Sequence, residues 1–180
     1  MNPDIHFEHV SRATRLERYN SKKKQATFMP VSVVCINFFN DGNLAFIIRS
    51  AACFGVQTIH VIGSIPEYAE LKRMSGSTVD FVNIVQHSSP SDFLIWSKKN
   101  RVKIVSAELS YRSQSLKDYR FDFDQQICIV AGNETTGVPE EILENSDVVK
   151  IDMPGIGFCL NTAQTTNIFL YEASRQFSDI

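Results

Sequence analysis

The sequence predicts an α/β protein built on a parallel β-sheet. From Val31 onward, short runs rich in β-branched residues alternate with stretches of helical periodicity. The run 127–132 (ICIVAG) is almost wholly apolar, as is typical of a central strand covered on both faces. Strands joined through helices indicate parallel pairing, since parallel strands need crossover connections. Such sheets usually bind ligands at the carboxyl ends of their strands.

The same alternation predicts the individual elements. Strands are expected where β-branched and other apolar residues cluster, at 31–36, 57–62, 81–86, 102–109, 127–132 and 148–152. Helices are expected at 43–55, 66–75, 90–100, 139–145 and 161–176. Asn43 is a candidate N-cap of the first helix, and Gly55 is a candidate stop. Pro139 suits the first turn of the short fourth helix, which has acidic residues beside it.

Composition places the chain among globular proteins. It has 180 residues, 43% hydrophobic and 21% charged, which fits one α/β domain at 31–180. No apolar run approaches the roughly 18 residues of a membrane span, and residues 1–10 lack a signal-peptide pattern. We therefore expect a cytoplasmic protein without membrane contact. The four cysteines form no C-x-x-C pair, so neither disulfides nor a metal site is indicated.

The charge of the chain is uneven. Residues 1–30 form a basic N-terminal segment with a net charge of +3, although the whole chain has a net charge of −2. Its basic residues are Arg12, Arg15, Arg18, Lys22, Lys23 and Lys24. The arginines recur every three residues, so a helix presents them along one side. This pattern is typical of an RNA-binding arm that contacts phosphates, although an ordinary solvated face has the same pattern.

Three strand-to-helix junctions are candidates for a functional site. In the first, Arg49 interrupts an apolar or small stretch from Leu44 to Val56. We expect this arginine to be at least half-buried and therefore to need a partner. One possibility is a structural ion pair with a core carboxylate such as Glu134. The other is an arginine directed into a cleft, where it holds a phosphate or a carboxylate.

The second and third junctions are rich in glycine. In the second, Gly132 and Gly137 are followed by Val138 and Pro139, where a phosphate-binding Walker loop needs Lys and Ser/Thr. That motif is excluded, and no strand is followed by G-x-G-x-x-G. The third junction, 153–161 (MPGIGFCLN), carries no charge, and its glycines allow the backbone to come close to a ligand.

The three junctions, in this order, resemble the three motifs of the SpoU, or TrmH-like, branch of the SPOUT RNA methyltransferases. The match covers roughly residues 31–177. NLAFIIRSAACFG is similar to the first motif, IVAGNETTGVPEEIL to the second, and VKIDMPGIGFCLNTAQTTNIFLYEASRQ to the third. The matching positions include Asn43, Arg49, Gly132, Glu134 and Asn161.

The resemblance implies a SPOUT fold with a deep trefoil knot in its C-terminal part, an exception to the rule against knots. It also implies a homodimer that uses S-adenosyl-L-methionine to methylate a ribose 2′-hydroxyl of tRNA or rRNA. By resemblance, the cofactor site is formed by Leu109, Gly132, Ile151, Met153, Gly155 and Leu160. The reaction-site positions are Asn43, Arg49, Glu134 and Asn161. The asparagine-leucine start of the first motif favours tRNA over rRNA as substrate.

The residue types fit this chemistry. The 2′-hydroxyl must lie in line with the methyl group and lose its proton as it attacks. In the family, the counterpart of Arg49 has been proposed as the base, but an arginine side chain is effectively always protonated. We therefore expect Arg49 to hold the RNA phosphate and the ribose oxygen, while Glu134 and Asn161 fix the geometry of the loops.

Some positions depart from the family pattern and keep other interpretations open. Cys159 and Ala163 stand where serines are common, and Asp152 replaces a common proline. One alternative is a catalytically weak or inactive RNA-binding protein of the same fold. Another is an unrelated monomeric α/β enzyme without a knot, in which Arg49 binds a small phosphorylated metabolite. The sequence names neither the RNA nor the nucleotide that is methylated.

Overall fold

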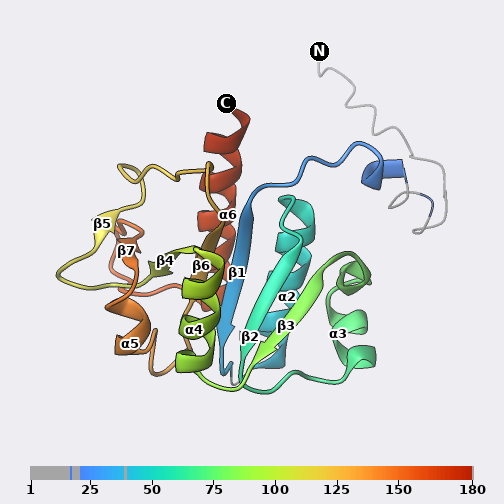
Figure 1. The fold of residues 1–180 in the computed structure, drawn as a ribbon, viewed down its shortest axis with the longest axis horizontal. Coiled ribbons are helices and arrows are strands. Elements are labelled where there is room, and N and C mark those ends of the chain that lie inside the picture. Colours follow the sequence, from blue (N-terminus) through green and yellow to red (C-terminus); the bar gives the residue numbers. More distant parts are fainter. Residues whose placement is uncertain (1–16, 18–20, 39, 180) are drawn as a thin grey trace, which may run out of the picture.

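The structure is a computed structural model that describes residues 17, 21–38 and 40–179. Within them, seven strands form a parallel sheet in the order β3-β2-β1-β6-β4-β7-β5 (Figure 1). The strands are β1 Val31–Ile36, β2 Thr58–Ile62, β3 Asn83–His87, β4 Lys103–Ala107, β5 Gln114–Ser115, β6 Ile127–Ala131 and β7 Asp147–Lys150. The predicted parallel α/β sheet is confirmed, and β6 is buried along its whole length.

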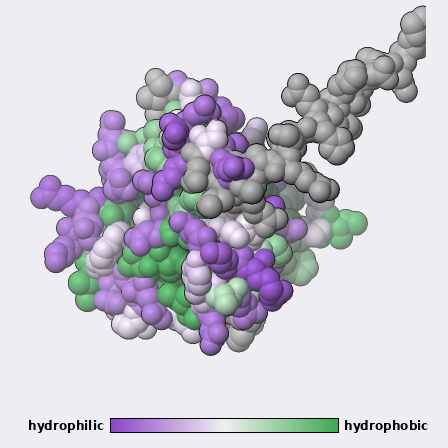
Figure 2. Space-filling model, turned by 90° about the vertical axis from the view of Figure 1, so that its right-hand side faces the viewer, coloured by the Kyte–Doolittle hydropathy of each residue, from purple (hydrophilic) through white to green (hydrophobic). Residues whose placement is uncertain are grey.

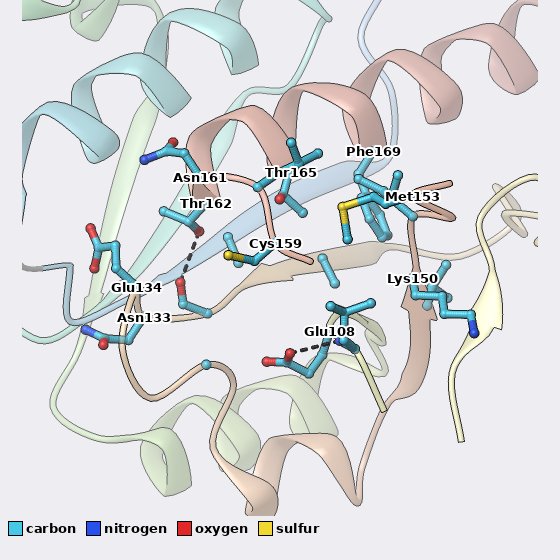
Figure 3. Close-up of a pocket in the computed structure, with 18 of the residues that line it drawn as sticks. Glu108, Asn133, Glu134, Lys150, Met153, Cys159, Asn161, Thr162, Thr165 and Phe169 are labelled. Carbon is cyan, nitrogen blue, oxygen red and sulfur yellow. Dashed lines mark hydrogen bonds between the residues drawn. The ribbon is translucent and has the colours of Figure 1, made fainter. Parts of the chain in front are cut away.

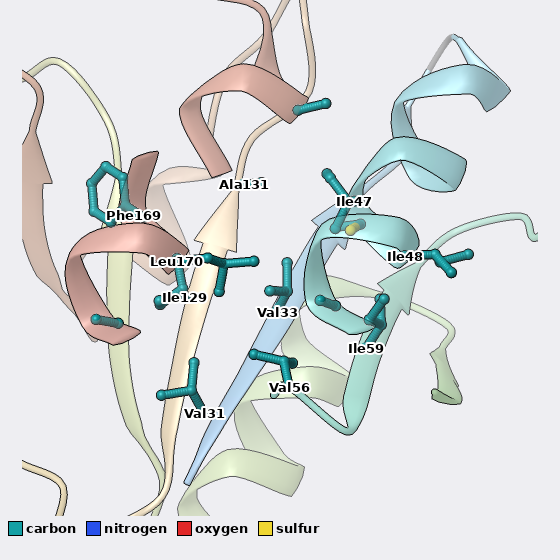
Figure 4. Packing of buried hydrophobic residues seen from close by; sticks show 14 of the residues in the cluster. Val31, Val33, Ile47, Ile48, Val56, Ile59, Ile129, Ala131, Phe169 and Leu170 are labelled. Carbon is teal, nitrogen blue, oxygen red and sulfur yellow. The ribbon is translucent and has the colours of Figure 1, made fainter. Parts of the chain in front are cut away.

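Helices cover both faces of the sheet (Figure 1). They are α2 Asp41–Cys53, α3 Tyr68–Met74, α4 Pro90–Asn100, α5 Glu140–Leu143 and α6 Thr162–Ser178, with a short 3-10 helix, η1, at Thr78–Phe81. One core cluster packs α2 and α6 against the sheet, and Figure 4 shows Ile47, Val33 and Phe169 within it. A second cluster packs α4 and α5 against the opposite face through Phe93 and Ile142.

The start of α2 differs from the prediction. Asn40 is the N-cap, and its side chain accepts a hydrogen bond from the backbone N–H of Gly42. The interpretation of Asn43 as the cap was therefore wrong, because a polar residue three positions earlier takes that role. The predicted stop is confirmed, since Gly55 follows the last turn with a φ of +74°. The two-residue strand β5 and η1 were not predicted.

The chain enters the sheet at the edge opposite the carboxyl ends of the strands. The backbone N–H of Met29 donates to the carbonyl of Gly55, and that of Ile127 donates to the carbonyl of Pro30. Figure 2 views the molecule from the side of α3. It shows a largely hydrophilic surface in which hydrophobic residues gather in patches among the hydrophilic ones. Among the described residues, no helix is long and apolar enough to cross a membrane. The trefoil knot stays a prediction.

Candidate functional site

A cavity of about 440 Å³ lies at the carboxyl ends of β4, β6 and β7, beside the start of α6 (Figure 3). This is the edge at which parallel sheets usually bind ligands. The wall combines apolar residues with polar and charged ones. It is formed by Ala107, Glu108, Leu109, Ala131, Gly132, Asn133, Glu134, Thr135, Gly137, Val149, Lys150, Ile151, Met153, Cys159, Leu160, Asn161, Thr162, Thr165 and Phe169.

The loop after β6 is a tight turn that holds its own shape. Asn133 and Gly137 exchange two backbone hydrogen bonds of 3.0 Å. The Asn133 side-chain oxygen accepts from the N–H groups of Thr135 and Thr136, and its amide nitrogen donates to the carbonyl of Asn37. A Cβ at Gly132 would lie 2.5 Å from the carbonyl carbon of Gly137. Only glycine therefore fits at position 132, where the backbone faces the cavity.

A chain of three side chains joins the three predicted motifs. Asn43, which is only 4% exposed, donates a hydrogen bond from Nδ2 to Oε1 of Glu134. Asn161 donates from Nδ2 to Oδ1 of Asn43 at 3.0 Å. The Asn161 side-chain oxygen in turn accepts from the N–H groups of Ala163 and Gln164, which makes it the N-cap of α6. The structure thus brings together three of the four predicted catalytic residues.

The start of α6 is also tied to β6. The hydroxyl of Thr162 donates to the carbonyl of Gly132 at 3.0 Å (Figure 3). Thr165, one turn further along α6, lines the same cavity. Neither threonine was predicted from the sequence. Thr165 lies four residues after Asn161, a helical spacing that places the two on the same side of α6, but this spacing does not indicate Thr162.

Sequence reasoning also missed Glu108. Its carboxylate lines the cavity and accepts backbone hydrogen bonds from Leu109 and Val138. A signal was present, because Glu108 directly follows β4 and Glu134 lies three residues after β6, and both strands end at the same edge of the sheet.

Most of the residues predicted to bind the cofactor lie in the cavity wall, namely Leu109, Gly132, Ile151, Met153 and Leu160. Gly155 does not line the cavity. A Cβ at Gly155 or Gly157 would have no atom within 4 Å, so the contacts of the described residues do not require glycine at either position. Ile156 and Phe158 in the same segment are exposed rather than packed on the cavity.

Arg49 is not buried, which corrects the sequence-based expectation. It lies on the exposed side of α2 and does not line the cavity. The alternative ion pair with Glu134 is also absent, because the salt bridges among the described residues do not include Arg49. The apolar stretch around Arg49 does not imply burial, since a helix on the surface of a domain still exposes one side.

The predicted RNA-binding lysines precede β1, at the end of the sheet opposite the cavity. Lys22, Lys23 and Lys24 are exposed, and the chain runs from them to the start of β1 at the opposite edge of the sheet (Figure 1). The predicted contacts Arg12, Arg15 and Arg18 lie outside the described residues.

Asp152, which replaces a common proline, is accommodated outside the cavity. It accepts a hydrogen bond from the hydroxyl of Ser115 and lies 3.7 Å from Nζ of Lys117. The hydrogen bond from Ser115 is the main reason why the pKa of Asp152 lies below its usual value, and the nearby lysines add to the effect. Within the described part of the chain, no group of three or more His, Cys, Asp or Glu residues is placed to hold a metal ion.

A parallel sheet with a cavity at its carboxyl edge, walled by the loops after β4, β6 and β7, is the arrangement of an α/β ligand-binding domain. Comparison with known proteins identifies the family. Residues 30–171 match the model of the SpoU rRNA Methylase family. The chain belongs to this family.

Three relatives illustrate the similarity. The chain is 27% identical over 135 residues to the tRNA (guanosine(18)-2′-O)-methyltransferase of Escherichia coli, covering 74% of this chain and 58% of that protein. It is 30% identical over 140 residues to the 23S rRNA (uridine(2479)-2′-O)-methyltransferase of Streptomyces viridochromogenes, covering 75% and 49%. The crystal structure of an AdoMet-bound rRNA methyltransferase from Sinorhizobium meliloti matches with a TM-score of 0.74 and 26% identity, covering 81% and 56%. The chain therefore spans roughly half the length of these relatives.

Proposed function

We propose that the chain is an S-adenosylmethionine-dependent 2′-O-ribose methyltransferase that acts on RNA. The observation that carries the proposal is that the three motifs meet at one cavity. Glu134 and Asn161, from the second and third motifs, line it, and Asn43 from the first motif is hydrogen-bonded to both. The relatives support it, because they are named tRNA and rRNA 2′-O-methyltransferases. They favour a methyl-transferring enzyme over an inactive RNA-binding protein.

The cavity suits S-adenosylmethionine, which supplies the methyl group. Its volume of about 440 Å³ lies within the range of roughly 300–1,000 Å³ that is typical of small-molecule sites. Apolar side chains such as Leu160 and Phe169 offer surface for a flat base, and the absence of a side chain at Gly132 lets a ligand come close to the backbone there. The relative from Sinorhizobium meliloti was crystallised with AdoMet, which supports the same cofactor here.

The residues of the chain would contribute mainly by positioning. Asn161 is held at both ends, by the N–H groups of α6 and by Asn43, so its place at the cavity wall is fixed before any ligand binds. Glu134 is oriented by the hydrogen bond that it accepts from Asn43. Because in-line attack depends on alignment of the reacting atoms, such a rigid wall lowers the entropic part of the barrier. Arg49 would hold an RNA phosphate and the ribose oxygen from outside the cavity.

We also propose that the chain forms a homodimer through the side of α2 and α6. These helices pack against each other and expose Phe46, Ile168 and Tyr171, which are 53%, 38% and 60% exposed. Arg49 is on the exposed side of the same α2. In a dimer that covers this apolar surface, Arg49 would lie beside the partner protomer. Sedimentation velocity tests this arrangement, since Phe46→Glu should convert the dimer to a folded monomer.

The substrate class is RNA, and the asparagine-leucine start of the first motif favours tRNA over rRNA. Related proteins act on both, so the RNA is not settled by family membership. The basic segment, with Lys22, Lys23 and Lys24, is proposed to contact phosphates of the same RNA. A cytoplasmic location is part of the same proposal.

Transfer of a tritiated methyl group from S-adenosylmethionine to bulk tRNA, with bulk rRNA in parallel, tests the activity. Mass spectrometry of the digested RNA should then show one new 2′-O-methylated nucleoside. Calorimetric binding of the cofactor without transfer to either RNA would favour the inactive RNA-binding protein. Absence of cofactor binding would contradict both.

A further inference from the structure

We propose that Glu108 recognises the ribose of S-adenosylmethionine through its carboxylate. This inference rests on the proposed function and adds a residue that lies outside the three motifs. Glu108 directly follows β4 and lines the cavity opposite the start of α6 (Figure 3).

The carboxylate is held in place by two different segments. Its Oε1 accepts from the backbone N–H of Leu109 at 2.8 Å, and its Oε2 accepts from the backbone N–H of Val138 at 2.9 Å. A Cβ at Gly137 would lie 2.5 Å from Oε2, so the glycine allows the carboxylate to reach this position. Glu108 therefore joins the end of β4 to the loop after β6 with little freedom to move.

The two backbone bonds leave acceptor capacity in a place where a ligand can use it. A carboxylate has roughly four lone-pair positions, and the described bonds occupy one on each oxygen. A half-buried charge beside apolar wall residues is stabilised by further donors. Of the other charged residues in the wall, Glu134 accepts from Asn43, and Lys150 points away from the cavity toward β5 (Figure 3). Glu108 is thus the carboxylate placed to accept from a ligand at the β4 side.

The position of Glu108 points to the ribose rather than to the reacting methyl group. Asn161 and Glu134, which match the reaction-site positions, lie at the α6 and β6 side of the cavity, whereas Glu108 lies at the β4 side (Figure 3). The reacting end of the cofactor must face Asn161, so Glu108 meets a part that does not react. A carboxylate after a strand that accepts from ribose hydroxyls is the arrangement used by dinucleotide-binding sheets.

A binding cycle tests the proposal with S-adenosylhomocysteine and its 2′,3′-dideoxyribose analogue as probes. Calorimetry with the wild-type chain should show that loss of the hydroxyls weakens binding about 10-fold or more, as expected for hydrogen bonds to a charged acceptor. In Glu108→Ala, the two probes should bind within about 2-fold of each other. Glu144→Ala, which alters an exposed glutamate outside the cavity, is the matched control and should keep the wild-type difference.

The cycle separates recognition from a purely structural role. If Glu108 only holds the Val138 loop, Glu108→Ala should weaken the binding of both probes by the same factor. The difference in affinity between the two probes would then remain, which would overturn the proposal. An analogue of S-adenosylhomocysteine without the adenine amino group tests the assignment to the ribose. If Glu108→Ala abolishes the difference in affinity between this analogue and S-adenosylhomocysteine instead, the ribose assignment is wrong. Should Glu108→Ala not fold, Glu108→Gln keeps a similar shape. The proposal then requires that the difference in affinity between the two probes be clearly smaller in Glu108→Gln than in the wild-type chain. Failure of the wild-type chain to bind S-adenosylhomocysteine at all would contradict the proposed function as well.

Discussion

Asn43 and Arg49 lie six residues apart on α2, yet the structure places them in opposite environments. Asn43 is buried and hydrogen-bonded to Glu134 and Asn161, whereas Arg49 is exposed and outside the cavity wall. Six residues correspond to about 600° of helical rotation, so the two side chains leave the helix in directions roughly 120° apart. In the proposed function, this motif serves two tasks, since its inner side fixes the cavity wall and its outer side contacts RNA beside a partner protomer.

The largest combined effect, on both methyl transfer and stability, is expected from Asn161→Ala, which alters the inner side. The change removes the N-cap of α6 and the hydrogen bond to Asn43 at once. Misplacement of the cavity wall should lower single-turnover methyl transfer by about 100-fold, and loss of the cap should reduce the free energy of unfolding by about 1 kcal/mol. The exposed Asn167→Ala on the same helix is the control. Unchanged transfer in Asn161→Ala would show that the polar chain is not needed.

A smaller effect is expected from acid, which acts on a region separate from both sides of α2. His60 and His87 lie 2.9 Å apart beneath α4, beside Trp96, and His60 Nε2 is buried without a hydrogen-bond partner among the described residues. Burial, with a smaller contribution from His87, lowers the pKa of His60 to about 4, and burial also lowers the pKa of His87.

Because these folded-state pKa values are depressed, the unfolded chain binds protons more readily. The contribution of the neutral histidines to the stability of the fold is fully present above about pH 6.5. It is lost as the pH falls toward about 4. We expect the free energy of unfolding to decrease by about 2 kcal/mol over this range. Denaturant titrations at pH 7.0, 5.5 and 4.5 measure the change, and His60→Leu should flatten it. An equally steep acid dependence in that variant would assign the effect to other groups.

The smallest effect is expected from neutralising the basic segment. Replacement of Lys22, Lys23 and Lys24 by alanine should weaken RNA binding several-fold and reduce its salt dependence, because up to three phosphate contacts are lost. Filter binding of tRNA at several salt concentrations tests this, and cofactor affinity should stay unchanged. An unaltered salt dependence would indicate that the segment is an ordinary solvated surface.

The sequence predicted much of the fold because each strand and helix has a strong local pattern. The cavity could also be anticipated, since glycine-bearing loops at 132–137 and 153–161 follow strands that end at one edge of a parallel sheet. The exposure of Arg49 could not be anticipated, because apolar neighbours in sequence do not reveal which side of a helix faces the core. The cap at Asn40 and the contacts of Glu108 escaped for a similar reason, since they depend on backbone positions fixed by the folded structure.

The most direct test of the division between the two sides of α2 is a paired measurement on Arg49→Ala. Calorimetry should give a dissociation constant for S-adenosylmethionine within about 2-fold of the wild-type value, because Arg49 does not line the cavity. Methyl transfer to tRNA by the same sample should fall by about 100-fold, with Arg49→Lys intermediate because lysine lacks the planar fork of arginine. Equal losses of cofactor binding and transfer would place Arg49 in the cofactor site and contradict the account.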